Sequence, residues 1–316
     1  MREATKGIWA MVAACLIWGI APIYYKLLVH LPPLDVVAHR TLWSLVTFLV
    51  VLGLQGRLGQ LRDAVRTRRE AAVIGFAAMM ISINWIFFIY SVSIGRVTEA
   101  SLGYYLYPLV AVLIGMVAFG ERLSWAQGMA VALAVLAVFV LTIGLGAAPW
   151  IALILSTSFG LYGLVKKRLS VGPVVSVTAE VLLLTPIALM ILGVDTWRGG
   201  GLHDLSARDL GLLVFSGGLT ATPLILFSYA TKRVKMATVG LAQYLNPTLQ
   251  FLCAVVLFGE PFGMWHAVAF GLIWSAIGIY SASALAQDRA TRSASSREGT
   301  SAQSVTKSLS EASAKP

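Results

Sequence analysis

Two stretches of this sequence are similar to each other: LGYYLYPLVAVLIGMVAFGE at residues 102–121 and LAQYLNPTLQFLCAVVLFGE at residues 241–260. They align without a gap at an offset of 139, and nine of the twenty positions are identical. Two unrelated apolar helices would share about two positions through ordinary residue usage. A second pair, WGIAPIYYKLL (18–28) and FGLYGLVKKRL (159–169), aligns at an offset of 141. The chain is therefore built from two similar halves.

Both halves are too apolar for a soluble protein. Hydrophobic residues make up 58% of the chain and charged residues only 12%, with a mean hydropathy of +0.81, whereas soluble domains are about 25% charged. Since helices satisfy their own backbone hydrogen bonds in lipid, we expect an all-α integral membrane protein. The net charge of +10 sits in short segments between apolar stretches. This pattern indicates a lipid bilayer as partner and argues against nucleic acid.

Ten stretches reach the length of roughly 20 residues that a crossing needs. They lie at approximately 7–27, 34–54, 71–91, 99–119, 124–143, 147–166, 174–193, 209–230, 236–258 and 264–285. Each half then holds five crossings, an odd number, so the second half enters the membrane from the other side. The sequence predicts two inverted five-helix repeats around a central cavity, the architecture that permits alternating access.

The distribution of Lys and Arg predicts the orientation in the membrane. With a cytoplasmic N-terminus, the cytoplasmic side holds every Lys and Arg except Lys26, Arg40, Arg96, Arg198 and Arg208. Because positive residues accumulate on the cytoplasmic side, we expect both termini there, in a multi-pass membrane protein.

Seven short motifs occur in order across residues 7–285: WGIAPIYYK (18–26), HRTLWS (39–44), NWIFFIYSV (84–92), EASLGYY (99–105), FGER (119–122), YGLVKKR (162–168) and QYLNPT (243–248). Together they resemble the drug/metabolite transporter superfamily, its EamA group and the RarD branch, which is named for an association with chloramphenicol sensitivity. The resemblance implies a ten-helix permease of the cell inner membrane, and the superfamily exports amino acids, metabolites and drugs. The chain departs from the branch at Tyr107, where an Asn is common. The second copy keeps Asn246.

This resemblance divides the chain into an EamA repeat at 1–146 with crossings one to five, and a second at 147–286 with crossings six to ten. Residues 287–316 are rich in Ser, Ala and Thr without apolar periodicity. Such a segment buries too little surface to offset its ordering entropy, so we expect a disordered cytoplasmic tail.

Polar and aromatic residues precede a proline in the matching crossings of both halves. Pro108 and Pro247 each remove a backbone hydrogen bond, and the freed carbonyls find partners in polar neighbours or a cavity. We expect the following side chains to line a substrate pathway: Tyr104, Tyr105, Gln243, Tyr244 and Asn246. The alternative for the tyrosines is an aromatic belt at the membrane interface.

Further candidates lie inside the predicted crossings. Asn84 can bond a substrate or join two helices. Trp18 and Tyr25 offer aromatic surface to amphipathic or cationic ligands, or anchor a helix. Glu180 lies about two turns into the seventh crossing, at the position that His39 holds in the first half.

For Glu180 the alternatives are a proton-coupling carboxyl and a structural hydrogen bond or ion pair with a neighbouring helix. His39 is a further candidate for the substrate cavity, and Arg40 beside it is likewise expected to face a cavity or a partner. The alternative is that both lie near enough to the interface to reach water. Lys26, Lys166 and Lys167 are orientation signals. Glu121 and Glu260 are expected to cap or pair at helix ends rather than bind substrate.

The function that these features predict is secondary transport of small amphipathic metabolites, amino acids or drugs by alternating access, with proton coupling as one form of it. The alternatives are an uncoupled facilitator and a membrane sensor or accessory subunit that does not transport. No GxxxxGK[ST], HExxH or GxSxG motif occurs, so neither ATP as direct energy source nor an enzyme is expected. We expect no cofactor and no metal. The substrate, direction, coupling ion and oligomeric state stay open.

Overall fold

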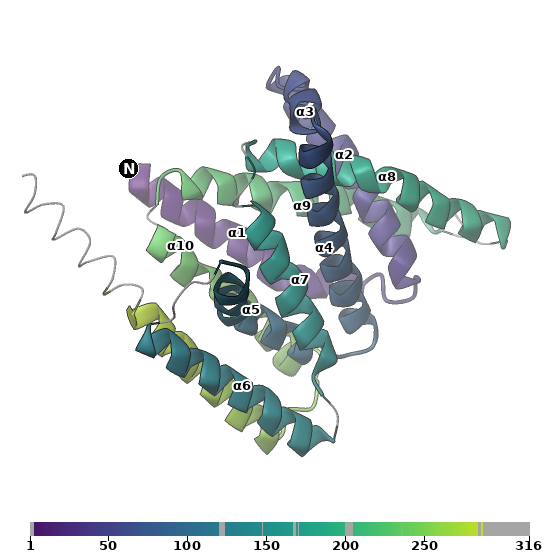
Figure 1. Cartoon of the computed structure of the whole chain (residues 1–316). Helices are drawn as coiled ribbons and strands as arrows, with labels where there is room; N and C mark the ends of the chain where they lie inside the picture. Colours follow the sequence, from purple (N-terminus) through teal and green to yellow (C-terminus); the bar gives the residue numbers. More distant parts are fainter. Residues whose placement is uncertain are drawn as a thin grey trace, which may run out of the picture.

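The computed structural model describes residues 3–119, 124–146, 148–166, 169, 171–199, 205–234, 236–283 and 286. Every regular element in these residues is a helix (Figure 1). Those that are long and apolar enough to cross a membrane are α1 (Glu3–Lys26), α2 (Pro33–Leu54), α4 (Arg68–Ser93), α5 (Val97–Phe119), α6 (Trp125–Leu145), α8 (Pro173–Trp197), α9 (Ala207–Thr231) and the C-terminal helix Met264–Ser283. For this part of the chain, the all-α membrane architecture is confirmed.

Two shorter apolar segments lie where the sixth and ninth crossings are predicted. The first is α7 (Trp150–Lys166). The second consists of α10 (Met236–Gln243), α11 (Leu245–Leu252) and a π-helical turn, Cys253–Leu257. A short helix, α3 (Gly59–Ala64), connects α2 to α4. In the part of the chain that the structure describes, eight helices therefore meet the length of a crossing, and the total of ten stays a prediction.

The ninth predicted crossing, 236–258, is not a single helix. Its first helix ends at Gln243, and the next begins at Leu245. Pro247 supplies the reason, because its ring clashes with the carbonyl four residues earlier, that of Gln243. The matching Pro108 lies inside the continuous α5. The two copies of the motif therefore differ in local structure.

Local sequence signals set where helices begin. Thr67 and Glu70 form a reciprocal capping box at the start of α4, and Ser124 and Gln127 form another at the start of α6. In each box a side-chain oxygen accepts from a backbone N–H that has no partner within the helix. The polar segments between apolar stretches thus define the helix ends.

Helices of the two halves interleave in the centre of the bundle. α1 packs against α9 and α11, and α7 packs against α4 and α5. A Cβ placed on Gly19 of α1 would lie 2.6 Å from Cβ of Leu249 in α11. A Cβ on Gly160 of α7 would lie 3.0 Å from Cδ1 of Ile114 and 3.5 Å from Cγ1 of Val110, both in α5. Glycine at both positions lets the helices approach closely. α6 and the C-terminal helix pack on each other at the side of this core (Figure 1).

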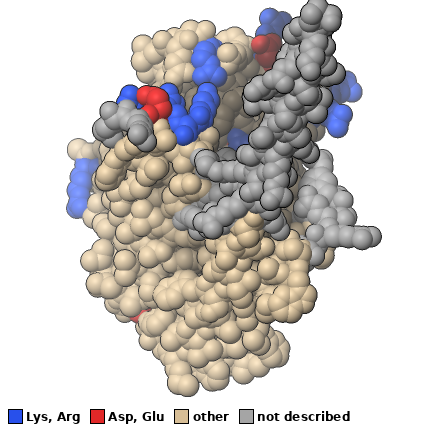
Figure 2. Space-filling view, turned by 90° about the vertical axis from the view of Figure 1, so that its left-hand side faces the viewer, with Lys and Arg blue, Asp and Glu red and all other residues tan. Residues whose placement is uncertain are grey.

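Charged side chains distinguish the two ends of the bundle. Glu3 at the start of α1 accepts from Lys6 at 2.7 Å and from Arg233, just after α9, at 2.9 Å. The Lys and Arg side chains visible in Figure 2 gather in its upper part. We call the end that carries Lys6, Arg57, Lys166 and Arg233 the basic end, and the end that carries Lys26, Arg96, Trp150 and Glu260 the opposite end.

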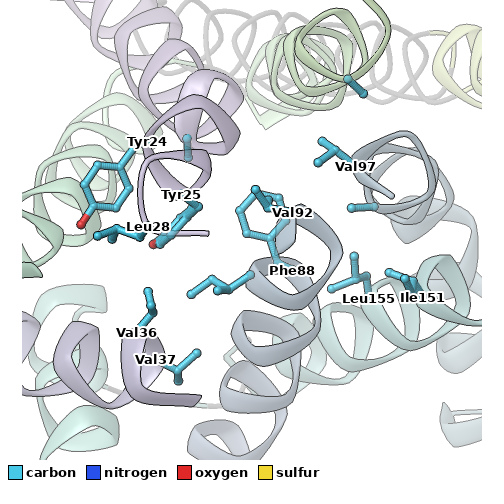
Figure 3. Close-up of a cluster of buried hydrophobic side chains, with 14 of the residues drawn as sticks. Tyr24, Tyr25, Leu28, Val36, Val37, Phe88, Val92, Val97, Ile151 and Leu155 are labelled. Atoms are coloured by element: carbon cyan, nitrogen blue, oxygen red, sulfur yellow. The ribbon is translucent and has the colours of Figure 1, made fainter. Parts of the chain in front are cut away.

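A cluster of buried apolar side chains fills the opposite end (Figure 3). We call it the opposite-end cluster, and its members include Tyr24, Tyr25, Leu28, Val36, Val37, Phe88, Val92, Val97, Ile151 and Leu155. Beside it, the carboxylate of Glu260 accepts hydrogen bonds of 2.7 Å from the backbone N–H groups of Val97 and Thr98. The expectation that Glu260 caps a helix end is confirmed. Glu121 and the predicted tail at 287–316 lie outside the described residues.

Candidate functional site

A cavity of about 750 Å³ lies in the middle of the bundle. Small-molecule sites typically measure about 300–1,000 Å³ and have mostly apolar and aromatic walls with a few polar groups. The deep part of this cavity borders the opposite-end cluster, with which it shares Tyr25 and Phe88. From there it extends to the junction of α7 and α8 at the basic end, where Lys166 and Val171 line it. Its size suits a metabolite.

Most of the side chains that the sequence singles out meet in the wall of this cavity. They are Trp18, Tyr25, Asn84, Tyr104, Gln243, Tyr244 and Asn246. Three others, His39, Tyr105 and Glu180, are not part of the wall. That any of these side chains binds a substrate stays a prediction.

Asn84 connects three helices at the cavity wall. Its Nδ2 donates to the carbonyl of Leu155 at 3.1 Å and to Oγ of Ser158 at 3.3 Å, both in α7. Its Oδ1 accepts from the hydroxyl of Tyr104 in α5 at 2.8 Å. The amide therefore joins α4 to α5 and α7 and, in the same place, forms part of the cavity wall.

His39 and Arg40 are neighbours in α2 with different environments. Both are buried, but only Arg40 lines the cavity. Its Nε donates to Oγ1 of Thr220 at 3.0 Å, and its guanidinium carbon lies 4.1 Å from the ring centroid of Trp85. Successive residues of a helix point about 100° apart, and the rotation of α2 turns Arg40 rather than His39 toward the cavity.

Tyr105 faces away from the central cavity. Its hydroxyl lies 2.6 Å from Oγ1 of Thr248, and its ring stacks on that of Tyr244 with centroids 6.5 Å apart. It borders a smaller pocket of about 440 Å³ together with Trp274. In this structure Tyr105 holds α5 against α11.

Glu180 lies just behind the cavity wall. Its carboxylate is fully buried and accepts from Lys166 at 2.5 Å, Ser176 at 2.8 Å and Tyr162 at 3.1 Å. All three donors line the cavity. Lys166, expected only as an orientation signal, thus forms an ion pair with Glu180 that connects α7 to α8.

Aromatic rings form a continuous surface along one wall. Tyr104 contacts Phe88 and Phe159 edge to face, with centroids 5.9 Å apart in each pair. Tyr107 contacts Phe159 at 4.8 Å. Tyr107 is the residue at which the chain departs from the RarD pattern, and here it lines the cavity. Such a surface favours ligands with flat apolar groups.

Residues 5–143 and residues 147–282 each match the EamA-like transporter family. The chain belongs to this family. The two matches together span most of the sequence, as the resemblance in the motifs predicts. It is therefore a multi-pass membrane protein of a transporter family.

Relatives of this EamA protein are similar over almost their whole length. "Protein RarD" of Streptomyces exfoliatus is 40% identical over 296 residues, covering 92% of this chain and 93% of the relative. "Protein RarD" of Escherichia coli is 34% identical, covering 92% and 98%. An "Uncharacterized transporter" of Vibrio cholerae is 38% identical, covering 93% and 97%. The chain is thus a RarD-like permease of the drug/metabolite transporter superfamily.

A solved crystal structure has the same fold. It superposes with a TM-score of 0.58 at 18% sequence identity, covering 91% of this chain and 99% of the other. Within the residues described here, no group of three His, Cys, Asp or Glu side chains is placed to hold a metal ion.

In this EamA protein, the sequence indicates only part of the cavity wall. It places Arg40 with His39 near the interface and interprets Lys166 mostly as an orientation signal, yet both Arg40 and Lys166 line the cavity. Hydropathy gives depth along a helix but not rotation about its axis. The position of Trp85 beside Arg40 follows from the packing of α2 against α4.

Proposed function

We propose that this chain is a secondary transporter of the inner membrane that moves a small amphipathic molecule through its central cavity by alternating access. The observation that carries the proposal is that one cavity of metabolite size takes its walls from helices of both halves. A site between two repeats is where alternating access places its substrate.

The proposal includes ten crossings arranged as inverted repeats. At the repeat offsets, α1 corresponds to α7, α4 to α9, and α5 to the α10–α11 segment. The contact of α1 with α9 then matches that of α7 with α4, and the contact of α1 with α11 matches that of α7 with α5. Gly19 against Leu249 and Gly160 against Val110 are the same contact in the two copies. This exchange of partners supports inverted symmetry.

The two ends of the cavity indicate which conformational state of the transport cycle the structure represents. The opposite-end cluster and the Glu260 cap lie across its deep end, while its walls continue to the basic end. Positive residues favour the cytoplasm, so we assign the basic end and both termini to the cytoplasmic side. The structure then corresponds to a state that faces the cytoplasm, and transport requires the opposite-end cluster to separate.

The first test is a ligand screen followed by flux. Purified protein is unfolded thermally with amino acids, amines, nucleosides, organic acids or chloramphenicol, since a ligand of the folded state raises apparent stability by about 2.7 kcal/mol at a hundredfold excess over Kd. A ligand that stabilises is then followed in proteoliposomes. We expect saturable flux that Asn84→Ala or Gln243→Ala weakens.

Crosslinking tests alternating access itself. In a background without native cysteines, Leu28→Cys in the loop after α1 and Val97→Cys in α5 are joined by a bifunctional thiol reagent long enough to span the cluster. Both belong to the opposite-end cluster. We expect the crosslink to stop flux, and each single variant treated with the same reagent to retain it. Full flux in the crosslinked protein would contradict alternating access. Ligand binding without flux, in the wild type and in every variant, would favour a sensor.

A further inference from the structure

The guanidinium of Arg40 is a buried cation without an ion-pair partner among the described residues. Its side chain is 7% exposed, and the ion pairs formed by described residues all lie elsewhere. Charged groups inside a membrane protein are costly and normally pair or face a cavity. Arg40 faces a cavity.

The contacts that hold the Arg40 side chain leave most of its N–H donors free. An arginine has five N–H donors. Nε uses one on Thr220, and the rings of Trp85 and Tyr25 contact the guanidinium at 4.1 and 5.7 Å. The bond from Nε is the hydrogen bond that the guanidinium makes to the described side chains and backbone, so its two terminal amino groups are free. These two groups form the planar fork that binds carboxylates in bidentate fashion.

The rest of the cavity wall does not neutralise this charge. Lys166 also lines the cavity, but Glu180 pairs with it. Apart from these, the charged side chain among the lining residues is Arg40 alone, in the part of the chain that the structure describes. The cavity wall therefore carries a net charge of about one positive unit at neutral pH.

A second polar atom in the wall lacks a partner. Gln250 of α11 is 2% exposed and lines the cavity. Its Nε2 donates to Oδ1 of Asn246 at 2.9 Å, but its Oε1 is buried without a donor. A buried acceptor left unsatisfied costs roughly 1–3 kcal/mol. It suits an N–H or O–H supplied by a ligand.

We propose that Arg40 is the anion-binding residue of the cavity and that the substrate is a small organic carboxylate with a flat apolar body and a hydrogen-bond donor. The carboxylate binds the free fork of Arg40, the body packs on the wall formed by Phe88, Tyr104 and Phe159, and the donor reaches Gln250. This inference rests on the proposed transport function and narrows its substrate class.

Three matched probes, each with a phenolic O–H as hydrogen-bond donor, separate charge from shape: 4-hydroxyphenylacetate, its neutral amide 4-hydroxyphenylacetamide, and the cation tyramine. Thermal unfolding in detergent is measured with each, together with larger aromatic carboxylates and their amides. We expect carboxylates to raise the unfolding temperature in a dose-dependent manner, and amides and amines of the same shape to bind about 10- to 100-fold more weakly.

Arg40→Gln should remove the preference for carboxylates, and Arg40→Lys should retain part of it, since Lys keeps the charge but not the planar fork. Without ligand, Arg40→Gln should unfold at or above the wild-type temperature, because it removes an unpaired buried charge. Arg96→Gln, at the opposite end outside the cavity wall, is the control and should bind carboxylates like the wild type.

Equal binding of the amide or amine by the wild type would overturn the inference, as would full carboxylate binding by Arg40→Gln or the absence of any shift across the carboxylate series. Flux assays keep the two proposals distinguishable. Flux of neutral or cationic compounds that survives Arg40→Gln would reject the anion site and retain transport. Carboxylate binding that depends on Arg40 but is not accompanied by flux would reject transport and retain the anion site.

Discussion

The ion pair of Lys166 and Glu180 shows how much one residue's role depends on its neighbours. Sequence alone offered two roles for Glu180, proton coupling or structural pairing. The carboxylate bonds an ammonium and two hydroxyls, so every donor that it requires is already present. The geometry supports the structural role, because a coupling carboxyl must exchange its proton with water or substrate during the cycle.

Glu180→Gln should lower the unfolding temperature of the purified protein, since breaking a buried pair by removing one partner costs about 3–5 kcal/mol when both are fully buried. Lys166 retains 20% side-chain exposure, so we expect a smaller loss. The double variant Lys166→Met/Glu180→Leu should regain most of it. A double variant no more stable than the single one would contradict this account.

The same variant tests coupling once a substrate is known. If Glu180 carries protons, Glu180→Gln abolishes flux driven by a pH gradient and leaves exchange intact. If its role is structural, the flux driven by a pH gradient and the exchange both decrease in proportion to the amount of folded protein.

At the scale of helices, proline kinks and close contacts between helices differ in how far the sequence predicts them. The kink signals at Pro108 and Pro247 are visible in the sequence, but only the second breaks its helix. The contacts of Gly19 and Gly160 connect helices of different halves, and such positions are recognised only when the partner helix is known. Helix packing in membranes depends on small residues at these crossings.

Gly19→Ala should destabilise the protein, because the new Cβ would lie 2.6 Å from Cβ of Leu249 and 3.2 Å from the carbonyl oxygen of Asn246. Overpacking of this kind costs roughly 1–3 kcal/mol. Gly75→Ala in α4 is the matched control, because nothing lies within 4 Å of its Cβ and alanine favours helix by up to about 1 kcal/mol. Thermal unfolding of both variants checks this. Equal effects would show that the α1–α11 contact is not tight.

At the scale of the whole molecule, the separation of charge between the two ends predicts orientation. Leu54 at the end of α2 is exposed at the basic end, and Trp197 at the end of α8 is exposed at the opposite end. Cys15 and Cys253 are buried and free, so both can be replaced to provide a background without reactive thiols.

In intact cells, a membrane-impermeant thiol reagent should label Trp197→Cys and should label Leu54→Cys only after the membrane is opened. The reason is that positive residues retain the basic end in the cytoplasm. The reverse pattern would invert the assigned topology, and with it the side from which the cavity is reached.

The sequence by itself determined that this is a helical membrane protein with a repeated half, and it located most of the long helices within a few residues, because hydropathy and helix caps are local properties. It also singled out several of the aromatic and amide residues of the cavity, since polar groups are rare in apolar stretches. Only the tertiary structure decided that Arg40 rather than His39 faces the cavity, and that Glu180 pairs with Lys166. The physical reason is that these outcomes depend on the rotation of each helix and on its partner, which packing between distant segments determines.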